Sequence, residues 1–270
     1  MKIRFHLSLV CICASMLFAQ CKKDKIESPS GEEVQVSVEF DNIVGGQNLL
    51  LNTVNYTNAA GEQFNVSLLQ YYISNIQLRK TDGTVFTVNQ DSSYFLIKEN
   101  DPNTRFARFK APSGDYDQLS FTIGVDSLRS TMDISKRTGV LDPSAGHDDG
   151  MYWGWNSGYI FFRLEGISPA APLDPSGQRK FRYHIGGFGG YSAPTINNIK
   201  KVTLDLKTSG IMQARAGRTP NIHLMADILK VFNGTTTLSI ASNPTVMFSE
   251  YSTNIATNYS SIFYHDHTEN

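Results

Sequence analysis

Hydrophobic and polar residues alternate with a period of two along most of the chain beyond residue 33. The clearest example is the stretch 34–40, where valine or phenylalanine stands at every even position and a polar residue at every odd one. Successive side chains of a strand point to opposite faces, so this pattern indicates half-buried strands. The same reasoning predicts strands at 119–125, 181–185 and 201–206, with weaker candidates at 72–79, 84–88, 94–98, 159–165 and 236–240.

Turns and short helices complete the predicted element order. Asp82-Gly83 stands between two strand candidates and is a typical hairpin turn. Residues 226–232 form a short segment that could be helical and closes at an Asn-Gly pair, which is a common helix end. Apolar residues spaced i, i+4, i+7 and i+8 from Ile255 to Phe263 indicate a second short helix.

Strands separated by glycine, aspartate, asparagine and proline are typical of an all-β fold. We predict an antiparallel β-sandwich with one or two short helices near the C-terminus, formed as one domain by residues 34–270. The composition agrees, since 11% of the residues are aromatic and only 18% are charged. With 24 basic and 25 acidic residues the net charge is −1, which argues against binding to nucleic acid.

The beginning of the chain has the pattern of an export signal. A basic start precedes an apolar run over residues 7–18, which is too short to span a bilayer as a mature helix. Cys21 follows this run, as in bacterial lipoproteins whose first mature cysteine is acylated. We predict a signal peptide at 1–20 and a lipidated tether at 21–33, which anchors the protein to a membrane of the cell envelope, at the outer membrane or the periplasmic face. The alternative is ordinary cleavage near the same position, which leaves the cysteine free.

The sequence contains little that is typical of catalysis. All three cysteines, Cys11, Cys13 and Cys21, lie in the leader or at its end, so the mature domain has no disulfide, no thiolate metal site and no cysteine nucleophile. The motifs HExxH and GxSxG are absent. The glycines at 186–190 have the wrong spacing for a phosphate-binding loop and predict a tight turn. We therefore predict a protein without catalytic activity of its own.

The segment 142–164 concentrates aromatic residues and holds His147 and both tryptophans, Trp153 and Trp155. In an extended chain Met151 shares one face with the two indoles. Two interpretations of this face remain open: it belongs to the core, as strand aromatics usually do, or it lines a pocket for a metal or another ligand. A thioether together with imidazole suits Cu(I), which prefers soft ligands.

Four further histidines are candidate metal ligands. His184 lies at the end of a predicted strand, on the face opposite its apolar residues. His223 shares a strand face with Met225, which gives a His–Met pair. His265 and His267 form a His-x-His motif, which in an extended chain points both rings to one side, a usual arrangement for copper or zinc. The alternatives are structural histidines and, for the His-x-His motif, a disordered polar tail.

Several short stretches, taken in chain order, resemble the sequence pattern of a known protein family. The most specific is MYWGWNSGY at residues 151–159, and weaker matches are GGQ at 45–47, YYISNI at 71–76, FTIGV at 121–125 and YHIG at 183–186. Together they resemble the MbnP-like family, which is named for the periplasmic partner protein of methanobactin copper-acquisition cassettes. The resemblance runs from about residue 34 to residue 250.

The resemblance implies an exported β-sandwich protein that binds copper beside a dihaem cytochrome c peroxidase-like partner. In characterised relatives this enzyme oxidises a tryptophan to kynurenine, and the modified residue and histidines contribute to the copper site. Carried over, this makes Trp153 or Trp155 the candidate for oxidation and His184 a candidate ligand. Asn42 departs from the family pattern, because copper-binding relatives can carry a histidine in the first strand region. The His-x-His motif is the candidate replacement.

Two functions therefore remain open. The first is an exported, lipid-anchored copper-binding protein, for which the candidate ligands are Met151, His184, His223, His265 and His267. The second is a non-catalytic surface binding module for a carbohydrate or peptide, which keeps the scaffold without the metal. Tyrosine- and tryptophan-rich loops on a sandwich are suited to such binding.

Overall fold

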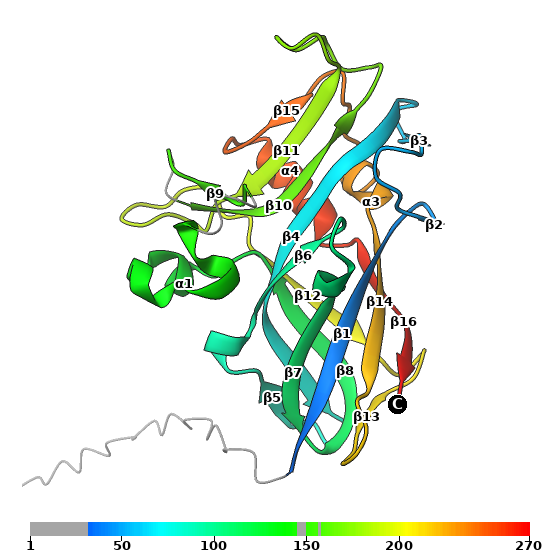
Figure 1. Ribbon diagram of the computed structural model, residues 1–270, viewed down its shortest axis with the longest axis vertical. Coiled ribbons are helices and arrows are strands. Elements are labelled where there is room, and N and C mark those ends of the chain that lie inside the picture. Colours follow the sequence, from blue (N-terminus) through cyan, green and yellow to red (C-terminus); the bar gives the residue numbers. More distant parts are fainter. Residues whose placement is uncertain (1–31, 145–149, 156–157) are drawn as a thin grey trace, which may run out of the picture. The chain divides into compact units, whose positions relative to one another are not determined.

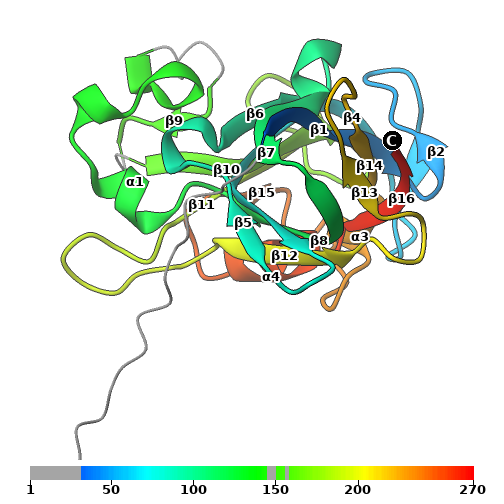
Figure 2. The same cartoon turned by 90° about the horizontal axis from the view of Figure 1, so that it is seen from below.

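The computed structural model describes residues 32–144, 150–155 and 158–270. The strands of this part form two β-sheets. Figure 2 shows β1, β7 and β14 in one layer and β8 and β12 in the layer that faces it. The smaller sheet has five strands, β1 (Glu33–Val44), β2 (Gln47–Asn48), β7 (Phe106–Pro112), β14 (Asn221–Asp227) and β16 (Phe263–Glu269).

The larger sheet is built around β4, a long strand that pairs with five others (Figure 1). Its strands are β3 (Tyr56–Thr57), β4 (Gln63–Lys80), β5 (Val85–Thr87), β6 (Tyr94–Lys98), β8 (Gly114–Ile123), β9 (Tyr152–Trp153), β10 (Gly158–Ile167), β11 (Lys180–Gly186), β12 (Lys200–Asp205), β13 (Met212–Ala214) and β15 (Thr245–Val246).

Short helices connect the strands. The α-helices of the described residues are α1 (Ser127–Thr131), α3 (Leu229–Phe232) and α4 (Ser252–Tyr259). The 3₁₀ turns are η1 (Gln90–Ser92), η2 (Pro102–Arg105), η3 (Ile134–Lys136) and η4 (Gly139–Leu141).

The predicted β-sandwich is confirmed, and it contains two parallel strand pairs. Strand β14 runs parallel to β1, and β15 runs parallel to β11, whereas the other paired strands of the described chain are antiparallel. The alternation of apolar residues indicates which face a strand buries but not the direction in which it runs, so the sequence did not reveal these two pairs.

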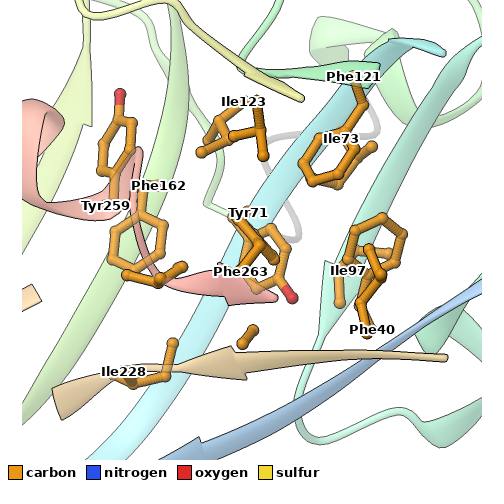
Figure 3. Packing of buried hydrophobic residues seen from close by; sticks show 14 of the residues in the cluster. Phe40, Tyr71, Ile73, Ile97, Phe121, Ile123, Phe162, Ile228, Tyr259 and Phe263 are labelled. Carbon is orange, nitrogen blue, oxygen red and sulfur yellow. The ribbon is translucent and has the colours of Figure 1, made fainter. Parts of the chain in front are cut away.

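The main core lies between the two sheets and is rich in aromatic rings. Phe40 of β1 packs edge-on against Phe121 of β8 and Phe263 of β16, with ring centroids 5.5 and 5.9 Å apart. Tyr71 of β4 also meets Phe40 and Phe263 (Figure 3). These four residues come from both sheets, so their burial joins the layers.

A second apolar cluster covers the opposite face of the larger sheet. Tyr71 belongs to the main core and Tyr72 to this second cluster, because neighbouring strand residues face opposite sides. The hydroxyl groups of Tyr72 and Tyr159 donate to the backbone carbonyls of Val140 and Leu141, at 2.8 and 2.5 Å. These bonds hold the segment after α1 over the sheet.

Most predicted strands are present, and short helices lie at both predicted places, α3 and α4, although α4 ends at Tyr259 and Phe263 of the predicted helix begins β16. The α3 helix is shorter than expected, because residues 226 and 227 still belong to β14. The prediction of a strand at 236–240 is wrong, since this stretch is a loop with one isolated bridge. At the end of this loop, the backbone N–H of Ile240 donates to the Glu62 carboxylate at 2.7 Å and not to a neighbouring strand.

Some predictions concern residues outside the described part of the chain. These are the signal peptide at 1–20, nearly all of the tether at 21–33 with Cys21, and His147. Within the described residues, no helix combines the length and the apolar character needed to cross a membrane.

Replacing Phe40 by alanine tests the role of the aromatic core. We expect the free energy of unfolding in urea to fall by about 3–5 kcal/mol, because the change leaves a cavity between the sheets. Leu128→Ala is the control, since this α1 side chain is 58% exposed. It should change stability by less than about 0.5 kcal/mol. Equal losses for the two variants would contradict the role assigned to Phe40.

Candidate metal centre

The outer face of the smaller sheet brings two histidines from distant parts of the chain together. His223 lies on β14, between β1 and β16, and its side chain points outward because its neighbours Ile222 and Leu224 are buried. His267 on β16 is its cross-strand partner. The centroids of the two imidazole rings lie 4.8 Å apart.

A β-bulge in β16 decides which way each side chain of the His-x-His motif points. The ladder pairs His223 with His267 and Leu224 with His265, so Asp266 is an extra residue between them. Paired residues face the same side of a sheet, and adjacent residues of β14 face opposite sides. His267 therefore joins His223 on the outer face, whereas His265 turns to the side of the buried Leu224. The prediction that both rings of the motif share one side is wrong, because the bulge breaks the alternation.

Asp266 places its carboxylate between the two outer imidazoles. Its Oδ2 lies 2.8 Å from Nδ1 of His267 and 3.4 Å from Nδ1 of His223. One possible ligand atom from each of the three residues falls within 4.8 Å of the others. The His223 side chain is 13% exposed and that of His267 is 48% exposed, so the group is anchored on the sheet and open on one side. Two imidazole nitrogens and a carboxylate oxygen are a donor set that copper or zinc accepts.

The contacts within this cluster also shift its protonation. The hydrogen bond between His267 and Asp266 raises the pKa of His267 and lowers the pKa of Asp266. A metal competes with the proton, since only neutral imidazole is a ligand. We therefore expect metal binding to strengthen as the pH rises through the raised pKa of His267. His265 lies outside the cluster: burial lowers its pKa, and its Nε2 lies 2.9 Å from the Thr268 hydroxyl.

Charged residues of β1 and η2 support His223 from its other side. Nε2 of His223 lies 3.8 Å from Oδ2 of Asp41, and Arg105 lies 4.0 Å from the same carboxylate. Arg105 also forms an ion pair of 2.7 Å with the buried Glu99. Asp41 therefore places a further negative charge near His223, at a distance longer than a hydrogen bond.

Asn42 belongs to the buried part of the same network. Its amide donates to Glu99 at 2.9 Å and its carbonyl oxygen accepts from the Tyr71 hydroxyl at 2.9 Å. Burial raises the pKa of Glu99. The asparagine that stands where relatives can carry a histidine is thus a fully buried structural residue, two strands away from the outer imidazole of His267.

His184 lies in the other sheet, on β11, far from the cluster on β14 and β16 (Figure 1). Its Nε2 is 2.8 Å from Oε1 of Glu165 on β10, and Arg163 is 2.6 Å from the same oxygen. The hydrogen bond with His184 and the charge of Arg163 lower the pKa of Glu165 to about 2. The structure therefore separates the predicted ligands into two places, with His184 held by an ion-pair network in one of them.

The tryptophan segment lies near this second place. Met151 and Trp153 are buried in the second apolar cluster, whereas Trp155 is 67% exposed. The predicted shared face ends at Trp153, because β9 stops there and the chain turns. The two indole rings still lie 5.5 Å apart. Trp153 packs on Gly186, where a Cβ atom would come within 2.8 Å of the indole.

The sequence reasoning missed the carboxylates of the candidate centre. Asp266 stands between two histidines, and this His-Asp-His order is the signal from which it could have been found. Asp41 carries no such signal, because it reaches His223 only through the parallel pairing of β1 with β14.

The fold defines the class of protein, a β-sandwich, and its outer face carries a cluster of metal-ligating side chains. The family model described as MbnP matches residues 33–248, so the chain belongs to the MbnP family. Among solved structures, MbnP from Methylosinus trichosporium is similar, with a TM-score of 0.53 and 17% identity over 81% of this chain and 82% of that chain. At this identity the likeness shows the fold alone. No curated protein matches the chain. The resemblance found from the residues is thus confirmed, although β16 lies beyond the matched range.

Asp266→Asn tests the hydrogen bond between Asp266 and His267. We expect the pKa of His267 to fall, because an amide cannot stabilise the imidazolium as a carboxylate does. The titration of the imidazole protons in NMR spectra of the metal-free protein measures this. Asp91→Asn, on the exposed η1 turn, is the matched control and should leave His267 unchanged. An unchanged pKa in the Asp266 variant would show that the two side chains do not interact.

Proposed function

We propose that this protein is an exported, lipid-anchored copper-binding protein of the MbnP type without catalytic activity of its own. We further propose that His223, Asp266 and His267 hold the ion. The observation that carries this assignment is the convergence of their possible ligand atoms within 4.8 Å. Family membership supports copper as the metal, and the placement of the site rests on this geometry.

The donor set is consistent with copper in its divalent state. Imidazole nitrogen and carboxylate oxygen bind Cu(II) more tightly than the other divalent first-row metals, by the usual order of stability. The neighbouring Asp41 contributes a further negative charge near His223. Met151, the predicted thioether ligand, is fully buried in the second apolar cluster, so this proposal does not use it.

Export and anchoring are part of the proposal and rest on the leader. The basic start, the short apolar run and Cys21 favour a lipoprotein that is held on a membrane of the cell envelope, at the outer membrane or the periplasmic face. The described domain, from residue 32 on, contains no cysteine, so its fold depends on packing and not on disulfides.

A dihaem cytochrome c peroxidase-like partner is the other element that the family suggests. Such an enzyme would reach Trp155 directly, since this indole is 67% exposed, whereas Trp153 is only 5% exposed. We therefore propose Trp155 as the residue that is oxidised. Peptide mass spectrometry of protein from its native cells should find Trp155 converted to kynurenine, with one oxygen gained and one carbon lost, and an unmodified Trp155 peptide from cells that make the partner would oppose this assignment.

Copper titration tests the proposed function. We expect the purified chain to bind one Cu(II) in competition with a chelator, and His223→Ala or His267→Ala to weaken binding at least about tenfold through the lost ligand. The electron paramagnetic resonance spectrum should report nitrogen ligands and should lose part of that coupling in each variant. Zinc is titrated in parallel to establish the preference for copper.

His184→Ala is the matched control, because His184 has nearly the same side-chain exposure as His223 but lies in the other sheet. It should bind copper like the unchanged chain. Loss of binding in this variant alone would move the site to β11. If the unchanged chain bound copper no more tightly than the variant lacking both His223 and His267, copper binding at the cluster would be refuted.

The second candidate function, a surface module for a carbohydrate or peptide, is favoured by one observation. Trp155 is exposed beside the buried Trp153, and an exposed indole on a rigid base is a common platform for sugar rings. This function would survive chelation of metals and would be lost in Trp155→Ala, as a glycan or peptide array would show. An array without signal would leave copper binding as the proposal.

A further inference from the structure

A pocket of about 740 Å³ lies beneath the segment that follows α1, in a different part of the domain from the proposed copper site. Asp91 and Tyr94 line it on one side, and the chain from Arg129 to Leu141 lines it on the other. Pockets of this volume hold small organic molecules. What such a molecule would meet follows from the charges and apolar groups in the lining.

The pocket contains an arginine that is almost fully buried. The Arg129 side chain is 6% exposed and lies over the Tyr94 ring, at 5.0 Å from the centroid. One of its terminal nitrogens donates to the backbone carbonyl of Lys136 at 2.6 Å. A buried cation is costly unless an anion compensates it. The group that compensates the charge of Arg129 therefore decides whether a bound anion could take its place.

The ion-pair partner of Arg129 is Asp91, whose side chain is 82% exposed. A carboxylate that is so well hydrated gains little from the pair, so a carboxylate entering the pocket can replace it at small cost. The Tyr94 hydroxyl donates to Asp126 at 2.5 Å and accepts from Arg129, so it is a neutral partner of the guanidinium. Lys136 adds a second positive charge to the lining.

The rest of the lining is suited to a hydrocarbon body. Met132, Val140 and Leu141 supply aliphatic and thioether surface, and Val140 remains 41% exposed at the surface. The flexible Met132 and the apolar surface of Val140 and Leu141 fit an unbranched chain, which they cover without specific contacts.

We propose that this pocket binds a small amphipathic carboxylate, whose anionic group pairs with Arg129 and Lys136 and whose aliphatic chain lies along Met132, Val140 and Leu141. Asp91 occupies the anion position when the carboxylate is absent. The proposal is independent of copper binding, because none of these residues belongs to the candidate metal centre.

Calorimetric titration of the full chain with sodium decanoate, below its micellar concentration, tests the proposal. We expect saturable binding of one decanoate, and binding of uncharged decanol at least about tenfold weaker because it lacks the charged hydrogen bonds. Asp91→Asn should bind decanoate about threefold more tightly, since the internal competitor is gone. Lys136→Gln should bind it about threefold less tightly.

Circular dichroism verifies that both variants keep the fold, which matters for Asp91→Asn because it leaves the buried Arg129 without its anionic partner, and Lys110→Gln on β7 is the control for a lost surface charge. Three results would overturn the proposal: no saturable binding to either the unchanged chain or Asp91→Asn, equal binding of decanol and decanoate, or weaker binding in Asp91→Asn. Binding to phosphatidylglycerol vesicles without binding of free decanoate would also overturn it and would indicate a membrane-contact surface instead.

Discussion

The two ladders that β14 forms hold the proposed copper site in place. Its inward side chains, Ile222 and Leu224, are fully buried, while His223 points outward between them. A slip of one residue in either ladder would exchange inside and outside, which the apolar core forbids. The register of His223 against Glu39 on β1 and His267 on β16, which also brings Asp41 near it, therefore follows from the burial of residues that never touch a ligand.

The domain offers two separate places for chemistry, one on each sheet. On the larger sheet, His184 and Glu165 lie in an ion-pair network near the tryptophan segment, which carries the most specific match to the family. On the smaller sheet, two of the three clustered side chains come from β16, which the family match does not reach. The family match and the clustered side chains of β16 thus concern different parts of the molecule.

Much of the fold could be predicted from the sequence, because alternation and burial are local properties of a strand. The pattern at 34–40 predicted the start of β1, and its four even positions are buried. Strand direction could not be predicted, since the partner of β1 lies far away in the chain. The strand expected at 236–240 failed because its apolar residues are buried while part of its backbone bonds the Glu62 carboxylate, an interaction that leaves no trace in the pattern.

The candidate site was harder to predict than the fold. His223 and His267, which the sequence predicted as candidate ligands, do lie together in the structure, but His265 lies on the other face and Asp266 was overlooked. Both errors have one physical origin, since a bulge adds a residue without changing the apolar pattern around it. The separation of His184 from the other histidines also depends on sheet topology, which spacing along the chain does not encode.

The irregularity in β16 makes one residue decide the composition of the cluster. The extra residue of the bulge is the one that supplies the carboxylate, while the imidazoles on either side keep their cross-strand positions. Deleting that single codon would restore a regular edge strand with His265 and His267 still opposite Leu224 and His223. One inserted triplet therefore separates a pair of facing histidines from a three-donor site, so descendants of the same scaffold could gain or lose this chemistry in a single step without rebuilding their interior.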